Sequence, residues 1–479
     1  MTKNYLPPEK RKKILFLADD IRTTSGIAGI AREIVIGTSH VYNFCVIGGS
    51  MKHPDAGKQL DLSADTNQHA GITDSYVKLY PTDGYGNPEL VRSLIKLEKP
   101  DAIMFFTDPR YWVWLFQMEN ELRVKLPFIY LNIWDDLPCP YYNAPYYESC
   151  DTLMAISKQT LNINKLVLGE KAKDKILEFV PHGINEKFYF PIDKSFDKYK
   201  EFLEFKKQLL KEKEYDFILM YNSRNIRRKA TSDIMIAYKL FCDKIGEEKA
   251  SKCALILHTQ PIDDNGTDLL AVRDLLAEDY MNIIFSDQRL GIEQMNYLYN
   301  MSDATILISS NEGWGLSLTE GLICGKMIIG NVTGGMQDQM RFEDEDGKWI
   351  DFDENFCSNH FGTYKKCGEW AIPVFPNNIS LIGSVPTPYI FDDRCDFRDV
   401  AKVIEQVYNL SPEERNRRGM KGREWALGDE AQFTAVKMCD KIINVIDKTF
   451  DTWKPRKHFE LIKIDKEYPK KKLKHKLIY

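Results

Sequence analysis

The chain has 479 residues, of which 43% are hydrophobic and 12% aromatic, so it is not an intrinsically disordered protein and should form two or three folded domains. Its net charge of −5 gives no overall bias toward nucleic acid or membrane. No apolar run reaches the roughly 18–20 residues of a membrane-spanning helix, and residues 14–18 end at two aspartates, which argues against a signal peptide. Ten scattered cysteines indicate a reducing compartment, so we expect a cytoplasmic protein.

The first half of the chain alternates short apolar runs with helical stretches. Seven runs predict strands, at 14–19, 44–49, 77–80, 102–107, 128–133, 152–157 and 176–180. This alternation is typical of a parallel sheet covered by helices on both faces. Gly26 and Gly29 follow the first strand, but their spacing does not fit a dinucleotide fingerprint, and no acidic residue ends the second strand.

Aspartates follow two of these strands. Asp108 comes after 102–107, and Asp135 and Asp136 come after 128–133. Ligands of parallel sheets bind at the carboxyl edge, so we expect these carboxylates to face a cleft. Aspartates also cap loops, and an Asp-Asp pair can bind a metal, so the pattern alone leaves three interpretations open.

A second set of strands begins at 217–223 and continues at 254–260, 282–287, 304–310 and 327–331. Arg224 follows its first strand directly, and Lys229 comes five residues later. A guanidinium and an ammonium at the carboxyl edge suit phosphate oxygens, the first as a bidentate donor and the second as a point charge.

The loop after 304–310 carries Glu312, Gly313 and Gly315, and a helix of about ten residues is predicted from near Leu316, with Gly325 as its stop. Free N–H groups in the first turn of such a helix, with its dipole, form an anion site. Glu320 lies eight residues after Glu312. Carboxylates beside an anion site require a ligand that also carries hydroxyls, and a nucleotide-sugar carries both.

Several features of this segment occur together in register. The Glu312-x7-Glu320 pair encloses Gly313-Trp314-Gly315, and the helix end at Cys324-Gly325 and the later Gly334-Gly335 follow. In this combination the segment resembles the E-x7-E region of retaining glycosyltransferases with the GT-B fold, grouped as glycosyltransferase family 4.

The resemblance implies an α/β protein with two Rossmann-like, doubly wound parallel-sheet domains that face a cleft, and C-terminal helices that cross back to the first domain. The corresponding boundaries are 1–195 for the acceptor-side domain, 196–214 for a charged linker, 215–395 for the donor domain with an insert at 336–388, 396–453 for the C-terminal helices, and 454–479 for a basic tail.

The resemblance also implies roles for individual residues. Arg224 and Lys229 match the family's Arg-x4-Lys signature for the donor diphosphate, although Ala230 stands where the family usually has glycine. Glu312 would hold the donor sugar and complete the catalytic set with Arg224 and Lys229, and Glu320 would hold the ribose. Further donor-binding candidates are Gly313, Gly315, Leu316, Gly26, Arg289 and Leu290, and weaker acceptor-side candidates are Asp135, Asp136 and Asp108.

The family is usually metal-independent, so we expect neither a metal nor any other cofactor beyond the nucleotide-sugar. The predicted function is retaining transfer of a sugar from a nucleoside diphosphate to a hydroxyl acceptor, either a glycan or another small molecule. Residues 454–479 hold ten Lys or Arg against three Asp or Glu, which leaves open a viral enzyme that glycosylates hydroxymethylated bases in DNA. A non-catalytic sugar-nucleotide-binding protein is a further alternative, disfavoured by the intact Arg, Lys and Glu set.

Overall fold

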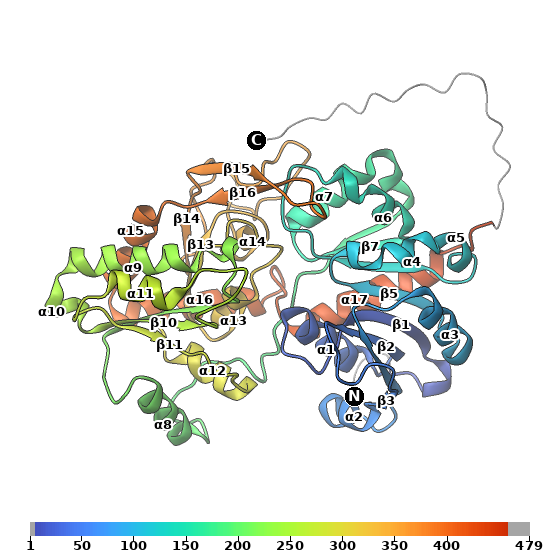
Figure 1. The fold of residues 1–479 in the computed structure, drawn as a ribbon, viewed down its shortest axis with the longest axis horizontal. Helices are drawn as coiled ribbons and strands as arrows, with labels where there is room; N and C mark the ends of the chain where they lie inside the picture. Colours follow the sequence, from blue (N-terminus) through green and yellow to red (C-terminus); the bar gives the residue numbers. More distant parts are fainter. Residues whose placement is uncertain (1–4, 458–479) are drawn as a thin grey trace.

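The computed structural model describes residues 5–457, and they form two α/β domains that lie side by side (Figure 1). The first contains an eight-stranded sheet in the order β3-β4-β2-β1-β5-β6-β7-β8, parallel except where β3 joins β4. Its strands are β1 (Lys12–Asp19), β2 (Tyr42–Ser50), β3 (Leu60–Asp61), β4 (Val77–Asp83), β5 (Ala102–Phe106), β6 (Phe128–Asn132), β7 (Thr152–Ala155) and β8 (Ile176–Phe179).

Helices cover both faces of this sheet, which explains why its central strands read as uninterrupted apolar runs rather than alternating ones. Residues 14–17 of β1 are completely buried. The covering helices are α1 (Gly26–Thr38), α2 (Ser63–Ala70), α3 (Pro88–Glu98), α4 (Val113–Gln117), α5 (Glu119–Leu122), α6 (Ala144–Ser149) and α7 (Lys158–Leu168).

The second domain contains a six-stranded parallel sheet in the order β11-β10-β9-β12-β13-β14. Its strands are β9 (Phe217–Asn222), β10 (Cys253–His258), β11 (Ile283–Phe285), β12 (Ala304–Leu307), β13 (Met327–Asn331) and β14 (Ala371–Val374). Its helices are α8 (Tyr199–Leu209), α9 (Thr231–Ile245), α10 (Glu247–Ala250), α11 (Leu269–Leu276), α12 (Ile292–Asn300), α13 (Leu316–Ile323), α14 (Met336–Met340), α15 (Phe397–Tyr408) and α16 (Pro412–Leu427).

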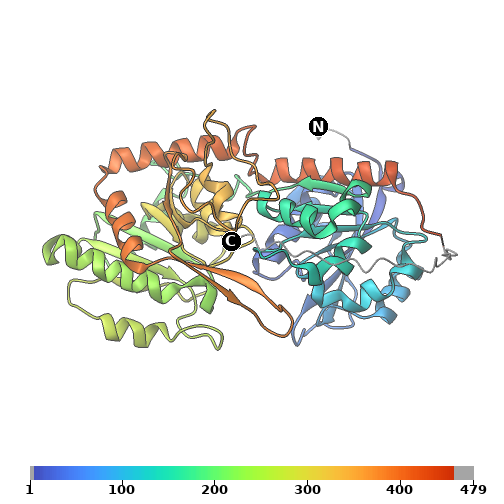
Figure 2. The ribbon, with the colours of Figure 1, turned by 90° about the horizontal axis from the view of Figure 1, so that it is seen from above.

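The last helix, α17 (Ala435–Thr452), returns to the first domain, as Figure 2 shows. It packs on α1 so closely that a Cβ at Gly37 would lie 2.4 Å from the sulfur of Cys439. Tyr42 of β2 donates a hydrogen bond of 2.6 Å to Asp447. These contacts tie the end of the described chain to the first domain. The fold is therefore the one predicted from the sequence, with two doubly wound domains and a C-terminal helix that crosses back to the first.

Within the insert at 336–388 and just after it, the chain contains structure that the sequence analysis did not predict. β14 adds an edge strand to the second sheet, and β15 (Asn378–Ile382) pairs with β16 (Ile390–Arg394) in a separate antiparallel hairpin. The linker also contains the helix α8. Most of the basic tail, residues 458–479, lies outside the described residues. None of the helices within residues 5–457 has both the length and the apolarity needed to cross a membrane.

Candidate functional site

The loop between β12 and α13 lies where the two domains meet. α13 begins at Leu316, and both Gly315, before it, and Gly325, after it, adopt positive φ angles, of 89° and 73°. A side chain at Gly313 would collide with the first domain, because its Cβ would lie 2.6 Å from the carbonyl oxygen of Ile133 and 3.0 Å from a carboxylate oxygen of Asp135. The glycines therefore let the backbone of one domain touch the other beside the N-terminus of α13.

Two cations converge on Glu312 in this loop. Arg228 donates from Nη1 to the Glu312 carboxylate over 3.0 Å and to the carbonyl oxygen of Asn311 over 2.6 Å, and the ammonium of Lys229 contacts the same carboxylate oxygen. Burial alone would raise the pKa of Glu312, but the charges of Arg228 and Lys229 outweigh it and lower that pKa to about 2. Glu312 is therefore an ionised carboxylate inside a cationic pocket.

The backbone at Ala230 explains how both cations reach the pocket. Residues 227–229 form a single 3₁₀ turn, and Ala230, directly after it, adopts a left-handed conformation with φ 52° and ψ 37° before α9 begins. Only glycine adopts this conformation without strain. This is the position at which the resemblance implied glycine, and here alanine adopts the left-handed conformation.

Arg224 lies outside this pair of cations. Its guanidinium donates to Asp263 over 2.7 Å, and its side chain is 64% exposed. Of the two cations proposed from the sequence, the structure brings Lys229 to Glu312 but places Arg228, rather than Arg224, beside it. Sequence spacing alone could not show which arginine lies beside Glu312, because Arg227 and Arg228 fall within the same basic run as Arg224.

Glu320 lies on a separate wall of the cleft, held by polar side chains from three other segments. The hydroxyl of Tyr299 donates to it, Asn222 donates over 3.4 Å, and Tyr189 also hydrogen-bonds to it. Burial raises the pKa of Glu320 to about 7, although these hydrogen bonds oppose the rise. The carboxylate thus titrates in the neutral range.

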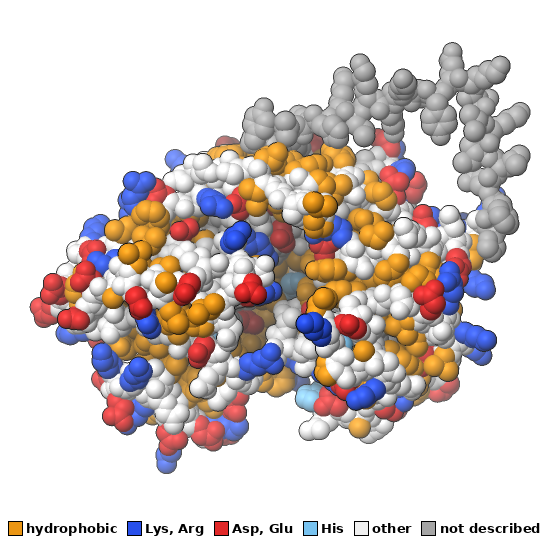
Figure 3. Space-filling model, in the orientation of Figure 1, with side chains coloured by type: hydrophobic (Ala, Val, Ile, Leu, Met, Phe, Trp, Pro, Cys, Tyr) orange, Lys and Arg blue, Asp and Glu red, His pale blue; other side chains and the backbone are white. Residues whose placement is uncertain are grey.

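Glu320 lines a cavity of about 330 Å³ between α1 and α12, at the lower size limit of small-ligand pockets. The space-filling view shows the hollow between the two domains (Figure 3). Four other residues predicted from the sequence to bind the donor line the same cavity: Gly26, Arg289, Leu290 and Leu316. A Cβ at Gly26 would lie 3.0 Å from Leu316, so this glycine keeps the two domains close at the cavity wall.

Other lining residues carry no motif in the sequence. Asn222 ends β9 and His258 ends β10, and further polar groups come from the turn before α1, from Arg32 and Glu33 of α1, and from Asn185 and Tyr189. A rule that takes the last residue of each parallel strand would have found Asn222 and His258. Tyr299 and Tyr189 carry no local signal, because only the tertiary fold brings them to Glu320.

The three aspartates predicted on the acceptor side occupy different surroundings. Asp135 lies 3.9 Å from Arg228, at the edge of the cationic pocket. Asp136 is completely buried, and Thr333 of the second domain donates hydrogen bonds to it over 3.1 Å and to Asp393 over 2.6 Å. Burial raises the pKa of both Asp136 and Asp393; the charge of Asp393 raises the pKa of Asp136 further, whereas a hydrogen bond between the two carboxyl groups opposes the rise at Asp393. Asp136 is therefore part of the domain interface.

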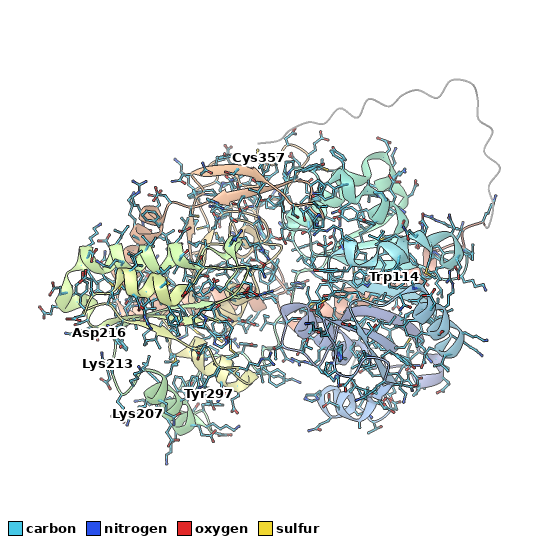
Figure 4. The ribbon with its side chains drawn as sticks, in the orientation of Figure 1. Trp114, Lys207, Lys213, Asp216, Tyr297 and Cys357 are labelled. Carbon is cyan, nitrogen blue, oxygen red and sulfur yellow. The ribbon has the colours of Figure 1, made fainter. Side chains whose placement is uncertain are left out.

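Asp108 forms an ion pair with Arg110 just after β5, and burial and the charge of Asp108 both raise the pKa of Asp135. Across residues 5–457, three or more His, Cys, Asp or Glu side chains nowhere come together in a group suited to a metal ion. Cys357 lies in the insert, at the upper edge of the molecule in Figure 4.

Residues 200–355 match the family model of the glycosyl transferases group 1. No curated protein matches the chain by sequence. The fold is shared with sucrose-phosphate synthase from Thermosynechococcus elongatus, at 14% identity and a TM-score of 0.63 over 92% of this chain and 100% of that one. It is also shared with HepE from Anabaena in complex with UDP and glucose, at 13% identity and a TM-score of 0.61 over 91% and 100%. A glycosyltransferase from Rickettsia africae aligns at 15% identity and a TM-score of 0.60 over 92% and 100%.

These solved structures share the fold, and the family model covers the segment in which Lys229, Glu312 and Glu320 lie. Together they show that the chain has the GT-B fold and that residues 200–355 resemble the glycosyl transferases group 1.

Proposed function

We propose that this protein is a retaining glycosyltransferase that transfers a sugar from a nucleoside diphosphate to a hydroxyl acceptor. The observation that carries the proposal is the convergence of Arg228 and Lys229 on one carboxylate at the N-terminus of α13. The buried Lys229 and the partly exposed Arg228 beside the N-terminus of a helix form an anion site, and Glu312 occupies it in this structure. A diphosphate supplies the charge that this site is built to hold.

The leaving diphosphate develops negative charge as the bond to the sugar breaks. In the proposed mechanism Arg228, Lys229 and the amides of residues 313–316 stabilise that charge, which is the largest catalytic contribution when no metal takes part. Released from the cations, Glu312 would accept hydroxyls of the donor sugar and stabilise positive charge on its ring. Arg224 would contribute less than Arg228, because Asp263 already holds its guanidinium.

The cavity between α1 and α12 would take the nucleoside. Glu320 faces it and would accept the two ribose hydroxyls, while Arg289 and Leu290 lie on the wall where the base would rest. The HepE structure contains UDP and glucose, which makes UDP-glucose a reasonable first donor to test. On the opposite side Asp135, beside Gly313 and Arg228, would face the incoming acceptor hydroxyl.

The retaining outcome rests on the likeness of residues 312–320 to the E-x7-E segment. It is tested by the anomeric configuration of the product, read by NMR before the sugar equilibrates. An inverted product would contradict the retaining assignment while leaving the transferase assignment intact.

The proposal is tested by screening nucleotide-sugars for thermal stabilisation and then for consumption, with glycans and hydroxymethylated DNA as acceptors. We expect one donor to stabilise the wild-type protein and to be consumed, and Lys229→Ala and Arg228→Ala to abolish both effects with the fold retained. Binding without any consumption would favour a non-catalytic sugar-nucleotide-binding protein. Sugar transfer only to DNA would favour the DNA-modifying alternative.

A further inference from the structure

The loop that leads into α13 is held by one buried side chain of α14. Gln339 is completely buried, and its Nε2 donates to the carbonyl oxygen of Trp314 over 2.6 Å and to that of Gly315 over 3.2 Å. Both helices lie on the side of the second domain that faces the first (Figure 1). Gln339 therefore binds the two peptide groups that come directly before the first turn of α13.

The hydrogen bonds around Gln339 allow its side-chain amide only one orientation. The indole Nε1 of Trp314 donates to the hydroxyl of Thr319 over 2.9 Å, so this hydroxyl directs its own hydrogen to Oε1 of Gln339, 2.8 Å away. A reversed amide would place its oxygen against the carbonyl oxygen of Trp314, with no hydrogen between them. The indole, the hydroxyl and the amide thus form a closed set of hydrogen bonds that begins and ends at Trp314.

Fixing these two carbonyl groups also fixes the N–H groups that follow them. In a trans peptide the C=O of one residue and the N–H of the next point in opposite directions. The N–H groups of Gly315 and Leu316 are therefore directed away from Gln339, and Leu316 lines the cavity proposed for the nucleoside. Within residues 5–457 neither N–H donates to another backbone carbonyl. Both groups can therefore donate to a ligand.

The backbone of this loop has little stiffness of its own. Trp314 lies between two glycines, and Gly315 adopts φ 89° and ψ 64°, one of the many conformations open to glycine. A hydrogen bond to an anion is strong when the donor is well aligned and weakens steeply when it is not. The loop therefore gains from a side chain that selects one conformation before the ligand arrives.

We propose that Gln339 is a positioning residue of the anion site, which aligns the N–H groups of Gly315 and Leu316 with the donor diphosphate. This inference rests on the proposed function and adds to it a residue that acts through the loop. Gln339 is completely buried behind Trp314 and Gly315, so its effect on the ligand passes through their peptide groups.

Isothermal titration of the full chain with inorganic pyrophosphate tests this role. Gln339→Met keeps the approximate size of the side chain and removes both donations, so we expect pyrophosphate binding to weaken about tenfold. The matched control is Gln337→Met. Gln337 is on the same helix and 1% exposed, and its amide donates to the carbonyl oxygens of Ser358, over 2.9 Å, and Gly334, over 3.3 Å. This variant should lose a similar amount of stability to urea and bind pyrophosphate like the wild-type protein.

Gln339→Glu provides a readout that a merely structural role would not give. A protonated carboxyl has one O–H donor and one carbonyl acceptor, so it can replace the amide between Thr319 and Trp314, whereas the ionised form has no donor. Burial favours the protonated form and raises the pKa of such a group. Pyrophosphate affinity, relative to the wild-type protein at the same pH, should be near one at about pH 5 and fall about tenfold by about pH 8.

The positioning role would be overturned if Gln339→Met bound pyrophosphate as tightly as the wild-type protein, or if Gln337→Met lost as much affinity. A relative affinity of Gln339→Glu that does not change with pH would also overturn it, and this comparison decides the question if Gln339→Met does not fold. The proposed function fails separately, when the wild-type protein binds pyrophosphate but consumes no nucleotide-sugar. In that case the variants would still show whether Gln339 aligns the anion site.

Discussion

Glu312 occupies the anion site that the donor diphosphate is proposed to fill, and this makes Glu312→Gln an informative substitution. In the wild-type protein the carboxylate contacts both Arg228, over 3.0 Å, and Lys229, so an incoming diphosphate must share or displace it. The amide of glutamine has nearly the same shape and carries no charge. We expect the variant to bind inorganic pyrophosphate more tightly than the wild-type protein while losing sugar transfer.

The expected size follows from the charges. A diphosphate that reaches the same two cations would lie about 5 Å from Glu312, where two unit charges repel by about 3 kcal/mol at an effective dielectric constant of about 20. Partial neutralisation by Arg228 and Lys229 leaves about half of this, which is about a tenfold gain in affinity. The variant should also be less stable without ligand, because the buried Lys229 and the partly exposed Arg228 lose their partner, and pyrophosphate should restore that stability.

Isothermal titration with pyrophosphate, at fixed ionic strength, measures this directly. The matched control is Glu369→Gln, which removes an exposed carboxylate paired with Arg417 and Lys421 and should leave pyrophosphate affinity unchanged. Equal or weaker binding by Glu312→Gln would refute the idea that the carboxylate competes with the diphosphate.

Three other predictions follow from single groups. Because burial raises the pKa of Glu320 to about 7, the carboxylate that we propose accepts ribose hydroxyls forms only as the pH rises through 7, so UDP affinity should increase about tenfold from pH 6 to pH 8, and Glu320→Gln should lack this increase. Protonation of the Asp136 and Asp393 pair stabilises the fold below about pH 4 and is lost as the pH rises through their raised pKa values. Asp136→Asn should therefore gain more unfolding free energy at pH 8 than at about pH 4, measured by urea denaturation, and an equal change at both pH values would contradict the pairing. Ala230→Gly should relieve the left-handed strain and stabilise the protein by about 0.5–1 kcal/mol, a gain that an unchanged thermal midpoint would disprove.

Much of the framework could be predicted because parallel strands buried on both faces leave a strong apolar signal. Each predicted strand has a counterpart in one of the two parallel sheets. The β12–α13–β13 unit could be placed because its loop glycines, its helix stop and both glutamates fall within one short stretch. β11 is shorter than predicted, since residues 283–285 lie half-buried at the sheet edge.

The features that the sequence analysis did not predict depend on contacts between residues that are far apart in the chain. Arg228 reaches Glu312 because of the left-handed turn at Ala230, a conformation that no local pattern assigns to alanine. The buried pair of Asp136 and Asp393 joins residues 257 positions apart, through a threonine supplied by a third segment. The hairpin is held by the first domain rather than by its own sequence pattern, so periodicity did not reveal it.

The central claim is that Lys229 and Arg228 hold the diphosphate of a sugar donor. The most direct measurement is release of nucleoside diphosphate from a panel of nucleotide-sugars, followed for the wild-type protein and for Lys229→Ala with its fold checked by circular dichroism. The account predicts that the wild-type protein turns over one donor and that the variant neither binds nor consumes it. Turnover by Lys229→Ala at the wild-type rate would contradict the account.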